Sequence, residues 1–241
     1  MSATTNWTLP SKHSLIPACD VTIDVYEELV KQTADLPMVS AYKIGFVLGL
    51  SAGLPKVVEV TRRYTDKPLI YDHQKAATDI PDTGEVFAAT LKQAGMDAVI
   101  LFPQAGPRTE EAWIRAAQKH ELGVIVGGWM THAGYKQPDD GYLTHEGVLR
   151  MYQLAAELGV TEYVVPGNQP DVIASIRNLL VEAGVQPTFY SPGLLTQGGG
   201  IAEAAKAADG NWHAIVGRRI YQSPNYREAA LEIWPSLDNS V

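Results

Sequence analysis

Short apolar runs alternate with longer segments of helical period along the whole chain, and this alternation limits the possible folds more than any other feature. The apolar runs occupy residues 15–20, 39–44, 69–72, 98–102, 124–127, 163–165, 188–190 and 214–216. A segment that can be helical follows each of them, at 25–34, 48–64, 84–94, 109–120, 145–158, 170–183, 201–207 and 225–233. Alternating strands and helices are typical of a parallel sheet, and eight of each predict a (β/α)₈ TIM barrel of the α/β class.

A doubly wound open sheet is the alternative fold. Its dinucleotide-binding form carries Gly-x-Gly-x-x-Gly directly after the first strand, whereas here the first run ends in Cys19-Asp20-Val21-Thr22. The length of 241 residues allows one large domain or two small ones, and the eight repeats use nearly all of it. We therefore predict a single barrel domain over residues 15–234, with an N-terminal extension at 1–14 and a C-terminal tail at 235–241.

The composition excludes several classes of protein. With 19 basic and 27 acidic residues the net charge is −8, which argues against a nucleic-acid binder. The single cysteine, Cys19, excludes an intramolecular disulfide framework and fits a reducing compartment. No apolar run approaches the roughly 18 residues of a membrane span, and the polar first fourteen residues do not resemble a signal peptide. We expect a soluble cytoplasmic protein with neither a membrane nor a nucleic-acid partner.

Charged residues follow three neighbouring strands. Asp20 ends the first run, Lys43 lies near the end of the second, and Asp72 ends the third, with Lys75 shortly after it. In a barrel, catalytic groups lie at the carboxyl ends of the strands, so these four side chains should meet at one mouth. Any one of them alone would usually be a solvated surface residue. Together they predict a network in which each charge keeps its neighbours ionised.

The loops after the last two strands have the character of a phosphate site. Pro192-Gly193 and Gln197-Gly198 follow the seventh run, and Gly217-Arg218 follows the eighth. Barrels commonly bind phosphate at this position through glycine N–H groups and a cation, and the guanidinium of Arg218 fits phosphate oxygens. We expect Arg219 to be a surface residue. After the fifth run, Thr131 and His132 either contact a polar ring or belong to an ordinary loop.

These motifs, in this order, resemble the orotidine 5′-phosphate decarboxylase family over about residues 15–234. The resemblance rests on Asp20, Tyr-Lys-Ile-Gly at 42–45, the Asp, Lys and Asp-Ile-Pro-x-Thr pattern at 72–83, Met-Thr-His at 130–132, Pro-Gly and Gln-Gly-Gly at 192–199, and Val-Gly-Arg-x-Ile-Tyr at 216–221. It implies decarboxylation of orotidine 5′-monophosphate to uridine 5′-monophosphate, in pyrimidine biosynthesis, by a homodimer that needs no cofactor and no metal.

The resemblance also implies roles for individual residues. The catalytic group would be Lys43, Asp72, Lys75 and Asp79, and the substrate-binding group would be Asp20, Ile80, Thr83, Thr131, Pro192, Gln197, Gly198, Gly217 and Arg218. Lys75 would protonate C6 as carbon dioxide leaves, and Asp72 would lie against the departing carboxylate. Asp20 and Lys43 would hold the ribose hydroxyls, Thr131 the pyrimidine, and Gln197 and Arg218 the phosphate. Asp79, with Ile80 and Thr83, would complete the site of the partner subunit.

Two features depart from the family pattern. The steps from Asp72 to Lys75 and from Lys75 to Asp79 are three and four residues, where the family usually has two and three. Residues three apart in a regular strand face opposite sides, so the chain must either bulge or leave the strand. We expect that the chain leaves the strand, with Asp72 as the last strand residue.

The second departure is Phe102-Pro103-Gln104, which replaces a segment in which many relatives carry a histidine, and Gln104 is given no role.

Two other functions remain open at this point. One is a metal-dependent sugar-phosphate lyase or decarboxylase on the same barrel, in which the acidic residues would hold magnesium. The other is a barrel that binds a phosphate-bearing ligand without catalysis, for which the unusual spacing of the Asp and Lys residues is the support. Lys43, the Gln-Gly-Gly loop and Gly217-Arg218 favour the decarboxylase over the metal-dependent enzyme. Tight binding of uridine monophosphate analogues without turnover would favour the non-catalytic barrel.

Overall fold

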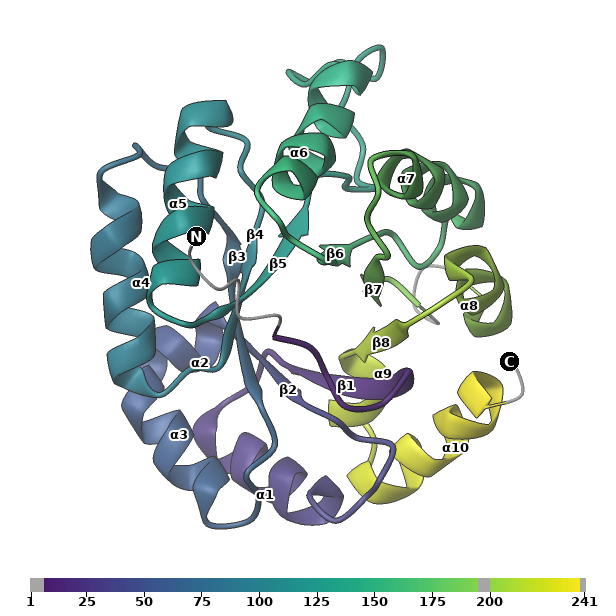
Figure 1. The fold of residues 1–241 in the computed structure, drawn as a ribbon. Helices are drawn as coiled ribbons and strands as arrows, with labels where there is room; N and C mark the ends of the chain where they lie inside the picture. The colour runs from purple at the N-terminus through teal and green to yellow at the C-terminus, as the bar shows by residue number, and fades with distance from the viewer. Residues whose placement is uncertain (1–6, 195–199, 239–241) are drawn as a thin grey trace.

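The computed structural model describes residues 7–194 and 200–238 and contains a closed barrel of eight parallel strands in chain order (Figure 1). The strands are β1 His13–Cys19, β2 Tyr42–Gly45, β3 Leu69–Ala76, β4 Ala98–Leu101, β5 Gly123–Gly127, β6 Glu162–Val164, β7 Thr188–Ser191 and β8 Trp212–Val216. The ring closes where β8 pairs with β1 over five residues, from His13 with Trp212 to Pro17 with Val216. The predicted barrel is confirmed, and the open sheet is excluded.

The helices form a ring outside the barrel (Figure 1). Within the described residues they are α1 Ile23–Thr33, α2 Phe46–Ser51, α3 Leu54–Arg62, α4 Thr83–Ala94, α5 Pro107–Lys119, α6 His145–Glu157, α7 Pro170–Glu182, α8 Ile201–Ala208, α9 Arg218–Tyr221 and α10 Tyr226–Asp238. The single helix predicted over 48–64 is two helices, because Gly53 adopts a left-handed conformation with φ 81° between them. The short helix α9 was not predicted. None of the helices in these residues has both the length and the apolar character needed to cross a membrane.

Alternate residues of each strand enter two separate hydrophobic clusters. In β4, Ala98 and Ile100 belong to the smaller cluster inside the barrel, whereas Val99 and Leu101 belong to the cluster shared with the surrounding helices. This alternation is what a closed barrel requires. At the amino-terminal end of the strands, Trp7 packs against the inner cluster and covers the first residue of β5. The opposite mouth is therefore the one available for a site.

Strand β3 differs from the expected form. It does not end at Asp72 but continues to Ala76, so the expectation that the chain leaves the strand after Asp72 is wrong. Its pairing with β4 changes register, because Tyr71 pairs with Val99 and Ala76 pairs with Leu101. Between these two pairs β3 advances five residues while β4 advances two. Three extra residues thus bulge from the ladder between Tyr71 and Ala76. The N–H of Phe102 donates to the carbonyl of Ala76 at 2.7 Å and holds the end of the bulged strand in place.

Candidate active site

A cavity of about 240 Å³ lies at the carboxyl ends of the strands. Its charged lining residues are Asp20 after β1, Lys43 in β2, Asp72 in β3 and Arg218 at the start of α9. Pro192 and Gly217 also line it, and its apolar wall consists of Ala18, Ile100, Phe102, Val164, Leu194, Ile215 and Val216. Six residues assigned to the site from the sequence therefore meet in one cavity.

Lys43 lies between two carboxylates. Its Nζ donates to Oδ2 of Asp72 at 3.0 Å and is 3.8 Å from Oδ2 of Asp20. The side chains of Lys43 and Asp72 are 7% and 6% exposed, whereas that of Asp20 is 32% exposed. Burial alone would lower the pKa of Lys43, but the charges of Asp72 and Asp20 outweigh burial and raise it above its ordinary 10.5. The ammonium is thus held charged at a largely buried position, where fixed charges act more strongly than at the surface.

The glycine of Tyr-Lys-Ile-Gly makes room for Asp20. A Cβ placed on Gly45 would lie 1.8 Å from Oδ1 of Asp20, so a side chain there would displace the carboxylate. Lys43 and Gly45 are two residues apart in β2 and therefore face the same side of the strand. The motif thus combines a cation with the space that its second carboxylate needs.

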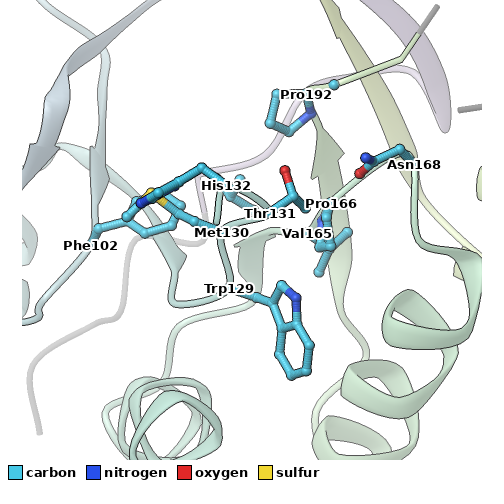
Figure 2. Close-up of a pocket in the computed structure, with 11 residues that line it drawn as sticks. Phe102, Trp129, Met130, Thr131, His132, Val165, Pro166, Asn168 and Pro192 are labelled. Carbon is cyan, nitrogen blue, oxygen red and sulfur yellow. The ribbon is translucent and has the colours of Figure 1, made fainter. Parts of the chain in front are cut away.

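A second cavity, of about 460 Å³, adjoins the first and shares Phe102, Val164, Pro192 and Gly193 with it. Thr131 lines this cavity, and Figure 2 shows its hydroxyl directed toward the space beneath Pro192. The amide of Asn168 points into the same space (Figure 2), and its Oδ1 is buried with no hydrogen-bond partner in the described residues. The larger cavity offers polar contacts, whereas the charges are concentrated in the smaller one.

Phe102 lines the site, although no function was predicted for it. Its side chain is 1% exposed and borders both cavities. A Cβ on Gly127 would lie 2.2 Å from Cζ of Phe102, so the ring occupies the space above this glycine. Since Leu101 pairs with Val126, the next residues along, Phe102 and Gly127, are level on adjacent strands. The sequence shows an aromatic residue and a glycine at the ends of two successive strands, but not the register that makes them level.

Gln104 and His73, which also had no assigned role, support nearby segments. Nε2 of Gln104 lies 3.4 Å from the hydroxyl of Tyr135, which itself donates to the carbonyl of Gly128. This pair ties the loop after β4 to the loop that carries Thr131. His73 hydrogen bonds with the hydroxyl of Tyr71 through its Nδ1.

Several predicted site residues lie elsewhere. Asp79 and Ile80 are exposed on the segment between β3 and α4, and Thr83 is the first residue of α4; none of them lines either cavity. Lys75 lies within the bulged part of β3, and only its backbone is described. Gln197 and Gly198 fall outside the described residues. The surface position expected for Arg219 is confirmed, because its side chain is 57% exposed; it forms an ion pair with Glu232 at 3.2 Å.

Comparison with known proteins places this geometry in a family. The model of the orotidine 5′-phosphate decarboxylase / HUMPS family matches residues 13–233, which include all eight strands and the charged cavity. The chain belongs to this family. Members with similar sequences include orotidine 5′-phosphate decarboxylases from Methanosarcina barkeri, 34% identical over 95% of this chain and 97% of the relative, and from Thermococcus kodakarensis, 32% identical over 89% and 94%.

Solved structures of family members share the fold. A crystal structure of orotidine 5′-monophosphate decarboxylase from Methanocaldococcus jannaschii, complexed with the inhibitor BMP, covers 96% of this chain with a TM-score of 0.79 and 29% identity. The enzyme from Pyrococcus horikoshii covers 93% with a TM-score of 0.75 and 29% identity. Because each of these chains is matched over nearly its whole length, the likeness extends over the entire barrel.

Proposed function

We propose that this chain converts orotidine 5′-monophosphate to uridine 5′-monophosphate and carbon dioxide without a cofactor. The observation that carries the proposal is the buried Asp72–Lys43–Asp20 network, which lies in the same cavity as Gly217 and Arg218. Membership of a family in which the similar relatives are named for this reaction supports it. The cavity combines fixed charges for the reacting carbon with a cation for the phosphate.

The reaction requires electrostatic stabilisation more than any other kind of catalysis. Loss of carbon dioxide from C6 leaves an electron pair in the plane of the ring, with no adjacent carbonyl to accept it. A fixed ammonium beside C6 stabilises that charge and then supplies the proton, and we assign this role to Lys75. Asp72 lies beside the departing carboxylate, and Lys43 keeps Asp72 ionised within the buried site. Removing one such preorganised group typically costs about 10²–10³ in rate.

In this proposal the phosphate binds at the side of the cavity that follows β8. Gly217 and Arg218 line that side, and Pro192 borders both cavities. Gln197 and Gly198 follow Pro192 in the chain and would complete the grip on the phosphate. Binding energy released this far from C6 can be used to hold the ring against the charges, so loss of these contacts should lower kcat as well as affinity. Thr131 is assigned to the pyrimidine because its hydroxyl faces the adjoining cavity (Figure 2).

The metal-dependent reaction is less well supported. In that reaction a divalent ion would hold the acidic residues together, whereas here the ammonium of Lys43 already lies between Asp20 and Asp72 and supplies the positive charge. Treatment with a chelator separates the two reactions. Turnover of orotidine 5′-monophosphate that is unchanged after the treatment supports the proposal, and its abolition would favour the metal-dependent reaction.

We further propose that the protein acts as a homodimer in the cytoplasm. Leu50, Ile80 and Val86 are 73%, 58% and 69% exposed, and exposed apolar side chains that lie together mark an interface. Leu50 and Val86 belong to α2 and α4, and both helices lie against Tyr71 of β3, through Gly49 and Phe87. Ile80 is hydrogen bonded through its carbonyl to Thr83, the first residue of α4. When a second copy covers this face, Asp79 and Thr83 of the first copy would reach the cavity of the second, and the reverse. The cytoplasmic location is supported by the single, buried, free cysteine.

The decisive experiment follows the absorbance of orotidine 5′-monophosphate in metal-free buffer. The wild type should consume it, and Lys75→Ala should remove turnover while circular dichroism shows an intact fold. Near-normal turnover by Lys75→Ala would refute the assigned chemistry. Binding of a uridine monophosphate analogue without any turnover by the wild type would instead indicate a non-catalytic barrel.

The shared site is tested by mixing inactive subunits. Lys75→Ala and Asp79→Ala are each expected to be inactive, but a heterodimer of the two has one site with both residues. Recovery of part of the activity after subunit exchange supports the shared site. No recovery, with exchange demonstrated by two affinity tags, would count against it.

A further inference from the structure

The segment Asp79-Ile80 lies outside both cavities, yet its backbone is firmly held. The hydroxyl of Thr109 donates to the carbonyl of Asp79 at 2.8 Å, and Nε1 of Trp113 donates to the carbonyl of Ile80 at 3.0 Å. Both donors belong to α5 and are four residues apart, so they face the same side of the helix. A single helix thus fixes two successive peptide groups of the segment.

The donors are buried, whereas the segment that they hold is exposed. Thr109 is 4% exposed and Trp113 is 6% exposed, and the Trp113 ring packs against Phe87 of α4 with 4.7 Å between the centroids. Ile80, in contrast, is 58% exposed. The carbonyl of Ile80 also accepts from the hydroxyl of Thr83 at 2.8 Å. The backbone is therefore anchored to the barrel, while the side chains of Asp79 and Ile80 are exposed.

We propose that Thr109 and Trp113 are positioning residues for the site of the partner subunit. This inference rests on the proposed function, in which Asp79 acts in the second copy. A carboxylate supplied across an interface is effective only when its backbone is held within a fraction of an ångström, and displacement by about 1 Å can cost about 10²-fold in rate. The two hydrogen bonds from α5 provide this restraint, so that docking of the second copy need not order the segment.

The variants are chosen to remove the donors and keep the packing. Trp113→Phe retains an aromatic ring against Phe87 but loses the N–H, and Thr109→Val retains the shape but loses the hydroxyl. The double variant should lower kcat/KM about 10- to 100-fold. Thr90→Val is the matched control, because the Thr90 hydroxyl also donates to a carbonyl, that of Val86, at 2.7 Å, but away from the segment. Its kcat/KM should equal that of the wild type.

Two heterodimers decide whether the effect crosses the interface. In the first, one subunit carries Lys75→Ala and the other carries Thr109→Val and Trp113→Phe. Its single site with Lys75 receives Asp79 from a subunit with intact donors, so about half of the wild-type activity is expected. In the second, all three substitutions are in one subunit and the other is wild type. The one site with Lys75 is then in the wild-type subunit, and its Asp79 comes from the subunit that lacks the two donors. Low activity is therefore expected.

Damage confined to the substituted subunit would give the opposite order, because the wild-type subunit of the second heterodimer would then be unaffected. That order, or a double variant with wild-type kcat/KM, would overturn the inference while leaving the decarboxylase activity established. Failure to recover any heterodimer with two affinity tags would overturn it as well. Absence of turnover in the wild type would refute the proposed function, and this inference with it.

Discussion

Glu110 on α5 is a buried acid, and its burial makes the stability of the protein depend on pH. Its side chain is 2% exposed, and Oε1 has no hydrogen-bond partner among the described residues. Burial raises the pKa of Glu110 from 4.5 to about 8; Arg150 opposes the shift, and Glu157 adds to it. Near neutral pH the carboxyl is therefore protonated in the folded protein and ionised in the unfolded chain.

The sign and size of the effect follow from this difference in proton binding. Because the folded-state pKa is raised, the contribution of Glu110 is most favourable below pH 4.5 and is lost progressively as the pH rises to about 8. Each pH unit in that window costs the wild type about 1.4 kcal/mol of unfolding free energy. At pH 7 the loss reaches about 3.5 kcal/mol, so Glu110→Gln, which cannot ionise, should be more stable than the wild type by up to that amount.

Urea denaturation at about pH 5.5, 6.5 and 7.5 measures the effect, with protein concentration held constant. The difference in unfolding free energy between Glu110→Gln and the wild type should grow by about 2.7 kcal/mol across the series. Glu111→Gln is the control, because Glu111 is on the same helix but only partly buried and paired with Arg115; its difference should not grow. A constant difference for Glu110→Gln across the series would refute the reasoning.

Three further predictions concern packing and phosphate binding. Gly127→Ala should push the Phe102 ring into the cavity, lowering stability by about 1–3 kcal/mol and kcat/KM at least about tenfold; no rescue by Phe102→Leu in the same chain would contradict this. Trp7→Ala should lower stability by about 2 kcal/mol in thermal denaturation while kcat/KM stays unchanged, because Trp7 is at the opposite end of the barrel. Arg218→Ala should reduce kcat/KM about 10- to 100-fold in steady-state assays, because the loss of a hydrogen bond to a charged group typically has an effect of this size. Wild-type kinetics for this variant would show that Arg218 does not bind the phosphate.

The barrel and much of its charged cavity could be predicted because they depend on local pattern and on topology. Strand and helix periods are properties of short windows, and repetition of the pair eight times leaves few folds. Once the strands form a barrel, their carboxyl ends must meet at one mouth. The nearness of Asp20, Lys43 and Asp72 therefore follows from their positions at strand ends.

The bulge in β3 and the place of Phe102 could not be predicted in this way. The step of three from Asp72 to Lys75 indicated that the strand was irregular, but whether it bulges or ends depends on how it pairs with β4, which is not a local property. Phe102 fills the space above Gly127 only because the two strands are in one particular register. The break at Gly53 is different, since the glycine followed by Leu54-Pro55 was a visible signal of a helix start.

The pairing of β1 with β8 also bears on how the protein folds. Ser14 and His213, bonded at 2.7 Å across this ladder, are 199 residues apart in the chain. Contacts between residues so distant form slowly, since the intervening chain must first be organised. During synthesis, β1 and β7 each keep an unpaired edge until residues 212–216 have emerged from the ribosome. The period of greatest risk of aggregation therefore ends only when this last strand closes the ring.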